Sequence, residues 1–327
     1  MLSAEIIKKV KQIQIRTGRQ VSDVLAGEYL SVFKGAGMEF DEVRPYIPGD
    51  DIRTIDWNVT ARMGIPYVKR FVEERELTVL LVVDISPSLD FGSVSRSKRE
   101  AASELSALLA FSAIQNNDNI GLLLFHETVE DFIPPRKGQK HALRIIREVL
   151  AYDEKIKTAN FADESSWWRK LSRRIRDPFL RLKKRSRYQS RQTNIKDALE
   201  FCQKILHRRA VVFLISDFLD EGYWDSLKIM KRKHDIISVL IEDKRETTPV
   251  DVGLLTMQDA ETGETIQIDT SSKKFRDEIN KNTEQRVENI KNLLAASGLD
   301  MIRINTEEST ADPLIAFFRQ RQKKYRS

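Results

Sequence analysis

From residue 77 onward, short apolar runs alternate with amphipathic stretches of helical spacing. The runs are rich in leucine and β-branched residues and almost free of charge, which is typical of strands covered on both faces. Strands that alternate with helices in this way form a mostly parallel sheet with helices on both faces, wound right-handed. Five such strands are expected, at residues 77–83, 120–125, 210–215, 236–241 and 301–304. The alternation therefore predicts an α/β fold.

Amphipathic helices are expected between and after these strands. The single cysteine, Cys202, lies on the apolar stripe of one of them, so core packing accounts for it and an intrachain disulfide is excluded. The expected helices span residues 97–115, 139–152, 194–206, 223–233, 274–296 and 312–324.

The first 76 residues follow a different pattern, in which Gly and Pro separate short strand-like pieces after an initial helix. We therefore expect residues 1–76 to form a helix and a small β-rich module, and residues 77–327 to form the α/β domain. Because the last strand of the module, at 67–72, runs almost directly into the first core strand, the module is expected to pack on the sheet. A second irregular stretch, at about 153–192, is interpreted as a basic insertion.

Charge is concentrated in that insertion. The stretch that begins at Trp167 and ends at Arg191 holds eleven Lys or Arg and one acid, a net charge of +10, which leaves −4 of the total +6 to the rest of the chain. A nucleic-acid role is therefore not expected from the overall basicity. The longest apolar runs fall well short of the roughly 20 residues of a membrane span, and the N-terminus lacks the pattern of a secretory signal. We expect a cytoplasmic protein.

A carboxylate and two hydroxyls directly follow the first predicted strand, in the order Asp84-Ile85-Ser86-Pro87-Ser88. Ligands in open α/β sheets bind where the parallel strands end. Oxygen donors at alternating positions of one loop can surround a hard cation, because Mg²⁺ takes six oxygens at about 2.1 Å and leaves some positions to water. The pattern alone is equally well explained as a strand-ending turn with a helix cap.

Two later loops are predicted to reach the same edge of the sheet. Thr193 directly precedes a predicted helix, and Asp217 follows the strand at 210–215. Each has a simpler explanation, as a helix N-cap and as a turn residue respectively. Three polar loops at one edge nevertheless favour a shared site.

Together, Asp84, Ser86, Ser88, Thr193 and Asp217 resemble in type and order the metal-ion-dependent adhesion site of von Willebrand factor A domains. The resemblance implies a von Willebrand factor A-like, Rossmann-like sheet. It also implies Mg²⁺ or Mn²⁺ bound by the two serines and the threonine, with the aspartates acting directly or through water, and an acidic side chain of a partner protein completing the octahedron. One departure is the residue after the threonine, which is commonly Asp in such domains and is Asn194 here.

The region before the first core strand narrows the resemblance. Over residues 31–217 the chain is similar to the prokaryotic domain of unknown function 58 family, on the segments GMEFDEVR at 37–44, PGDDIRTIDW at 48–57, AR at 61–62 and VKRF at 68–71. That family resembles the von Willebrand factor A partners of MoxR-type AAA+ ATPases. The resemblance implies such an ATPase as partner, in chaperone-like maturation or stress response.

The PGDDIRTIDW segment is interpreted as structural in preference to a second binding site. We expect Asp50 or Asp51 to cap a short helical turn and Arg53 to pair with a carboxylate. Trp57 is expected to anchor the module on the sheet.

Apolar residues recur at three- and four-residue spacing through the basic insertion, from Trp168 to Leu182. This pattern suits an anionic membrane surface or an acidic groove of a partner. A solvated helical hairpin packed on its own domain explains it equally well. Since the insertion ends two residues before Thr193, it is expected to overhang the metal edge.

Enzymatic chemistry is not expected. Haloacid dehalogenase-type phosphatases need a second Asp two residues after the first, and that position is Ser86, which also lacks the Gly-x-Ser-x-Gly context of a hydrolase. There is no phosphate-binding Gly-x-x-x-x-Gly-Lys-Ser/Thr loop, and the four histidines lack zinc spacing. The sequence therefore predicts a metal-dependent, protein-binding adaptor. The alternative is a peripheral membrane or scaffold protein that binds through the basic insertion.

Overall fold

The computed structural model describes residue 29 and residues 37–74, 77–93, 96–159, 193–247, 250–258 and 265–326. The helix expected near the N-terminus lies outside these residues. So does the charged part of the insertion, from Trp167 to Arg191.

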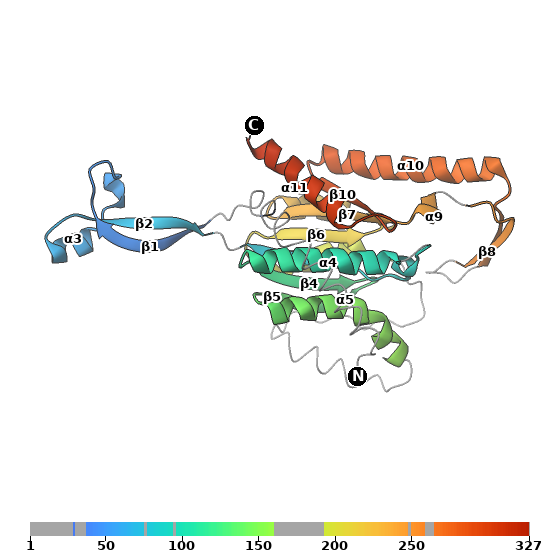
Figure 1. The fold of residues 1–327 in the computed structure, drawn as a ribbon, viewed down its shortest axis with the longest axis horizontal. Coiled ribbons are helices and arrows are strands. Elements are labelled where there is room, and N and C mark those ends of the chain that lie inside the picture. Colours follow the sequence, from blue (N-terminus) through green and yellow to red (C-terminus); the bar gives the residue numbers. More distant parts are fainter. Residues whose placement is uncertain are drawn as a thin grey trace.

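A six-stranded sheet forms the centre of the α/β domain (Figure 1). Its strand order is β10-β7-β6-β3-β4-β5, and every pairing is parallel except that of the edge strand β5 with β4. The strands are β3 Thr78–Asp84, β4 Asn119–Phe125, β5 Val129–Arg136, β6 Val211–Ser216, β7 Asp235–Glu242 and β10 Asp300–Asn305. The predicted fold class, an α/β fold with a mostly parallel sheet, is confirmed.

Helices cover both faces of this sheet, as predicted. On one face lie α4 Lys98–Gln115, α5 Gln139–Ala159 and α11 Ala311–Arg326; on the other lie α7 Ile195–Ile205, α8 Trp224–Lys231 and α10 Lys273–Ala296. Short helices η3 Pro87–Asp90 and α9 Lys244–Thr247 follow β3 and β7.

The central strand β3 shows why the predicted strands are so apolar. Its side chains alternate between faces, so Leu81 packs with α4, α5 and α11, while Leu80 and Val82 pack with α7, α8 and α10. Both faces are buried, so neither set of positions tolerates charge.

Several elements differ from the prediction. The edge strand β5 was not predicted, because its Pro134 and Pro135 interrupt the apolar pattern; an edge strand tolerates proline since one side of it needs no ladder hydrogen bonds. The hairpin of β8 Leu254–Gln258 and β9 Thr265–Asp269 was also missed. Helix α5 continues to Ala159, past the expected end at 152.

The N-terminal module is an antiparallel hairpin of β1 Gly37–Pro45 and β2 Tyr67–Glu74. Its connection, the hairpin tip (residues 46–66), holds the helices η2 Ile52–Thr54 and α3 Trp57–Met63. Figure 1 shows the hairpin extending away from the six-stranded sheet, with the tip at its far end, and not lying on the sheet as predicted. The division of the chain at residue 76 stays a prediction.

The predicted roles of the tip residues are confirmed in part. The Asp51 carboxylate caps η2 by accepting from the Arg53 amide at 2.9 Å. Among the described residues, Arg53 has no carboxylate partner, and it is Arg44 that pairs with Asp50. The anchoring role of Trp57 is wrong, because its side chain is 68% exposed.

Among the residues that the structure describes, no helix combines the length and the apolarity that crossing a membrane requires.

The stability of the fold should depend strongly on Phe213, an aromatic side chain in the core of the sheet. Phe213 of β6 is fully buried, so Phe213→Ala should lower the free energy of unfolding by about 3 to 5 kcal/mol. Ile229→Ala, at a position 52% exposed on α8, is the control and should change it by less than about 1 kcal/mol. Urea unfolding measures both; equal losses would contradict the assignment of Phe213 to the core.

Candidate metal centre

Asp84 ends β3 and lies at the centre of the polar cluster. Its side chain is fully buried. One carboxylate oxygen, Oδ1, accepts from the Ser86 amide at 2.8 Å, and Oδ2 accepts from the Ser216 hydroxyl at 2.7 Å. Because Ser216 ends the neighbouring strand β6, Asp84 joins the two loops that leave the sheet side by side.

The two serines of the loop lie together. The Oγ atoms of Ser86 and Ser88 are 2.8 Å apart. Neighbouring oxygens of an octahedron with metal–oxygen distances of about 2.1 Å lie about 3 Å apart, so this spacing suits two adjacent ligands of Mg²⁺. Arg99 of α4 holds the backbone of this loop, because its Nη2 donates to the carbonyls of Ile85 (3.2 Å) and Ser86 (3.3 Å).

Asp217 follows β6 and is paired with a buried lysine. The Lys98 ammonium, fully buried at the start of α4, donates to Asp217 Oδ2 at 3.0 Å and to Glu246 Oε1 of α9 at 2.7 Å. Burial alone would lower the pKa of Lys98, but the two carboxylates outweigh it and raise that pKa. The ammonium of Lys98 therefore stays positively charged beside Asp217.

Asp84 has no such cation. Burial, and then the negative charge of Asp217, raise the pKa of the Asp84 carboxyl to about 7. Within the described residues, no Lys, Arg or His forms an ion pair with it. A buried carboxylate without a counterion is costly, so a divalent cation beside it would be stabilised.

Thr193 is buried at the same edge and is held by its neighbours. The Asn194 amide donates to the carbonyl of His126, just beyond β4, at 2.7 Å. Asp220, from the loop after β6, accepts from the Ile195 amide at 2.7 Å. The start of α7 is thereby tied to the end of β4 and to the loop that carries Asp217.

Asn194, the departure from the resemblance, has a structural role. It is the N-cap of α7, where its Oδ1 accepts from the Asp197 amide at 3.0 Å. An aspartate would cap the helix as well, so the loss of charge leaves the local fold intact.

The five predicted residues therefore meet at one edge of the sheet. Ser86 contacts Ser88, Asp84 contacts Ser216 at the end of the strand that precedes Asp217, and Thr193 lies two residues before the first residue of α7. Within the described part of the chain, no three His, Cys, Asp or Glu side chains form a group that could hold a metal, so a cation at this edge would rely on the hydroxyls. Hydroxyl oxygens with two nearby carboxylates fit a hard cation such as Mg²⁺ or Mn²⁺.

The polar groups that complete the cluster were not predicted. Lys98 lies in the helix expected at 97–115, and the prediction gave neither Lys98 nor Ser216 a role. Glu246 lies in α9, 148 residues from Lys98 in sequence. The sequence held one signal for Lys98. It begins a helix whose following residues are mostly alanine, serine and leucine, a composition that is typical of a buried helix.

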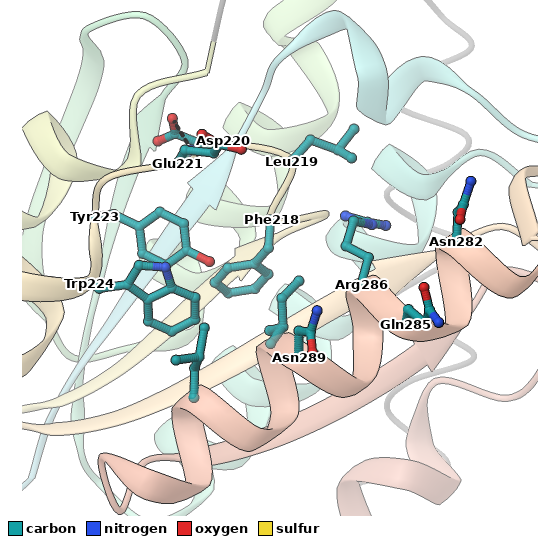
Figure 2. A pocket seen from close by; sticks show the side chains of 12 residues that line it. Phe218, Leu219, Asp220, Glu221, Tyr223, Trp224, Asn282, Gln285, Arg286 and Asn289 are labelled. Atoms are coloured by element: carbon teal, nitrogen blue, oxygen red, sulfur yellow. Dashed lines mark hydrogen bonds between the residues drawn. The ribbon is translucent and has the colours of Figure 1, made fainter. Parts of the chain in front are cut away.

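A groove lies beside the cluster, between the loop after β6 and helix α10 (Figure 2). The carbonyl of Asp217 accepts from Arg286 Nη1 at 3.1 Å, so one residue faces both the cluster and the groove. The next residue, Phe218, adopts a φ of 52°, which a non-glycine residue rarely takes. Its buried ring, and that of Tyr223, form the apolar wall of the groove.

Residues 42–289 match the family model described as "Protein of unknown function DUF58". The uncharacterized protein Rv1480 of Mycobacterium tuberculosis is 24% identical over 317 residues, which cover 96% of this chain and 89% of that protein. The uncharacterized protein Mb1516 of Mycobacterium bovis has the same identity and coverage.

Solved structures also show similarity. BatB from Bacteroides thetaiotaomicron has a TM-score of 0.41 and 15% identity, covering 76% of this chain and 99% of that chain. The SpRpn10 VWA domain has a TM-score of 0.34 and 12% identity, covering 73% and 94%. Both TM-scores are below 0.5, so the fold class is assigned from the strand order of the sheet and not from these structures.

Removing the buried ammonium should destabilise the edge. Lys98→Met leaves Asp217 without its cation, and we expect the free energy of unfolding to fall by about 3 to 5 kcal/mol. The matched control is Lys244→Met, which breaks the more exposed pair with Glu307 and should cost less than about 1 kcal/mol. Similar losses in the two variants would show that the buried pair is not structurally important.

The raised pKa of Asp84 predicts a pH dependence of stability in chelator-treated protein. The folded state binds this proton more tightly than the unfolded chain, whose ordinary value is 3.8. The stability contributed by the proton is therefore present below about pH 4 and is lost as the pH rises towards 7.

Asp84→Asn should flatten that part of the profile, measured as urea stability between these limits. Asp225→Asn, at a side chain 92% exposed, is the control and should leave the profile unchanged. A wild-type profile that the Asp84 substitution does not alter would contradict the assignment.

Proposed function

The chain belongs to the DUF58 family, and from the geometry of its sheet edge we propose that it is a metal-dependent, protein-binding adaptor and not an enzyme. Ser86, Ser88 and Thr193 would hold Mg²⁺ or Mn²⁺, with Asp84 and Asp217 acting directly or through water. When bound, the metal supplies a Lewis-acidic position that a carboxylate oxygen can occupy.

The observation that carries this proposal is the location of the cluster. In the order β10-β7-β6-β3-β4-β5, the chain winds outward in both directions from β3, so the switch in winding direction falls between β3 and β6. Open α/β sheets bind their ligands at this point, outside the carboxyl ends of the strands. Asp84 and Asp217 follow these two strands.

The charges of the cluster favour a carboxylate from a partner. Serine and threonine hydroxyls are neutral ligands, and Lys98 already neutralises Asp217. A divalent ion held in this way keeps part of its positive charge and attracts an anionic ligand. An Asp or Glu side chain of a protein would supply that ligand.

Hydrolytic catalysis has less support from the same atoms. The hydroxyl of Ser86 interacts with that of Ser88 and with the carboxylate of Asp84. The carboxylate of Asp84 is occupied on both oxygens, by the Ser86 amide and the Ser216 hydroxyl. A serine nucleophile needs a base that is free to take its proton, and Asp84 is fully buried with both oxygens already accepting hydrogen bonds.

For the partner we propose a MoxR-type AAA+ ATPase, in chaperone-like maturation or stress response in the cytoplasm. Support comes from the family to which the chain belongs and from the resemblance of its motifs. The competing candidate is a peripheral membrane or scaffold protein acting through the stretch from Trp167 to Arg191, whose net charge of +10 supports it.

Metal titration tests the proposal. Chelator-treated protein should bind Mn²⁺ and Mg²⁺ saturably, measured by calorimetry and by the paramagnetic resonance of free Mn²⁺. Ser86→Ala and Ser88→Ala should each weaken binding on the order of 10-fold or more. The control is Ser106→Ala, a buried serine of α4 whose hydroxyl binds only its own helix, and it should bind like wild type.

Capture of a purified MoxR-type ATPase tests the partner. Capture should require the metal and be lost in Ser86→Ala. Capture that survives chelation and Ser86→Ala, but is lost when the basic stretch is neutralised, would favour the competing candidate.

A further inference from the structure

The hairpin tip (residues 46–66) exposes a group of large apolar side chains. They are Ile47 (58% exposed), Ile52 (66%), Trp57 (68%), Met63 (59%) and Ile65 (52%). Scattered single apolar residues are normal on a protein surface, but a contiguous apolar region indicates a binding surface. These five lie within one connection of 21 residues, so exposed apolar side chains are concentrated at this end of the hairpin.

The tip is held together by polar contacts and not by these side chains. Arg44 forms two hydrogen bonds with the Asp50 carboxylate, at 2.9 and 2.7 Å, and the same carboxylate accepts from the Ile47 amide at 2.9 Å. Tyr46 and Pro66 close the base of the tip through a backbone hydrogen bond of 2.9 Å. The exposed apolar side chains are therefore free for an external contact.

The same contacts occupy the acidic groups of the tip. Asp51 caps η2, and Asp56 caps α3 while pairing with Lys69 at 3.2 Å. Two guanidinium groups are left: Arg53 and Arg62 are exposed, and within the described residues neither forms an ion pair. The exposed side chains of the tip are therefore mainly apolar, with the two arginines and Asp51 among them.

We propose that the hairpin tip inserts into the headgroup region of an anionic lipid bilayer. Figure 1 shows the tip at the free end of an arm that stands clear of the sheet, so it can reach a flat surface without obstruction. A protruding apolar end suits a deformable bilayer, whereas a folded partner would need a matching cavity. This surface is separate from the metal centre, and the proposal does not rest on it.

The chemistry of the individual residues matches the two layers of a bilayer surface. Trp57, at the first position of α3, belongs to the residue type that concentrates at membrane–water interfaces. Isoleucine and methionine side chains enter the acyl boundary. Arg53 and Arg62 provide charge complementary to lipid phosphates and serine headgroups.

Vesicle binding of the full-length protein tests the proposal. The probes are vesicles of phosphatidylcholine containing phosphatidylserine, and vesicles of phosphatidylcholine alone. The double variant Ile52→Ser/Trp57→Ser should lower the partition coefficient onto the anionic vesicles on the order of 10-fold or more. Its melting temperature should match wild type, because both side chains are exposed.

A matched control removes apolar surface elsewhere. Ile229→Ser/Leu254→Ser changes two side chains that are 52% and 80% exposed on α8 and β8, away from the tip, and should leave partitioning unchanged. Arg53→Gln/Arg62→Gln should weaken binding to the anionic vesicles and leave the weaker binding to neutral vesicles unaltered. The anionic vesicles should shift Trp57 emission to the blue, seen as the difference between wild type and Trp57→Phe.

Three results would overturn the proposal. The first is absence of wild-type binding to the anionic vesicles. The second is unchanged binding by Ile52→Ser/Trp57→Ser, which would assign membrane contact to another part of the chain. The third is self-association of wild type in sedimentation that the same variant abolishes, which would make the tip a contact between two copies.

Discussion

The edge of the sheet depends on the ion pairs of one buried group, the ammonium of Lys98. It is fully buried and joins the start of α4 to Asp217 after β6 and to Glu246 in α9. A buried charge is tolerated only when it is paired, so three segments far apart in sequence must stay together. Without this cation, Asp217 and Asp84 would face each other as two uncompensated carboxylates in a buried site.

Topology explains why these groups meet. Parallel pairing aligns the ends of β3 and β6, and Ser216 connects them by donating to Asp84 at 2.7 Å. Because the connections leave these two strands towards opposite sides, a crevice opens between their loops. The start of α7 is held to the loop after β6, because Asp220 accepts from the Ile195 amide.

The sequence predicts what depends on periodicity and on residue type at strand ends. It identified the parallel strands and most helices, and it identified Asp84 and Asp217 because each follows a buried apolar run. It could not identify Lys98 as a partner of Asp217, because the pairing depends on how α4 crosses the sheet. It was wrong about Trp57, since an aromatic residue in a turn-rich segment is equally compatible with anchoring a module and with facing solvent.

On the proposed function, the metal alone cannot select a partner, because any accessible carboxylate could complete its coordination. Selectivity must come from surfaces beside the metal that a wrong partner would leave unfilled or would clash with. The groove along α10 has the required position, since Asp217 contributes its carboxylate to the cluster and its carbonyl to Arg286. The groove also combines apolar and polar surface, since the rings of Phe218 and Tyr223 lie beside polar side chains of α10 (Figure 2). Affinity and selectivity would then arise from adjacent parts of one surface, joined through a single residue.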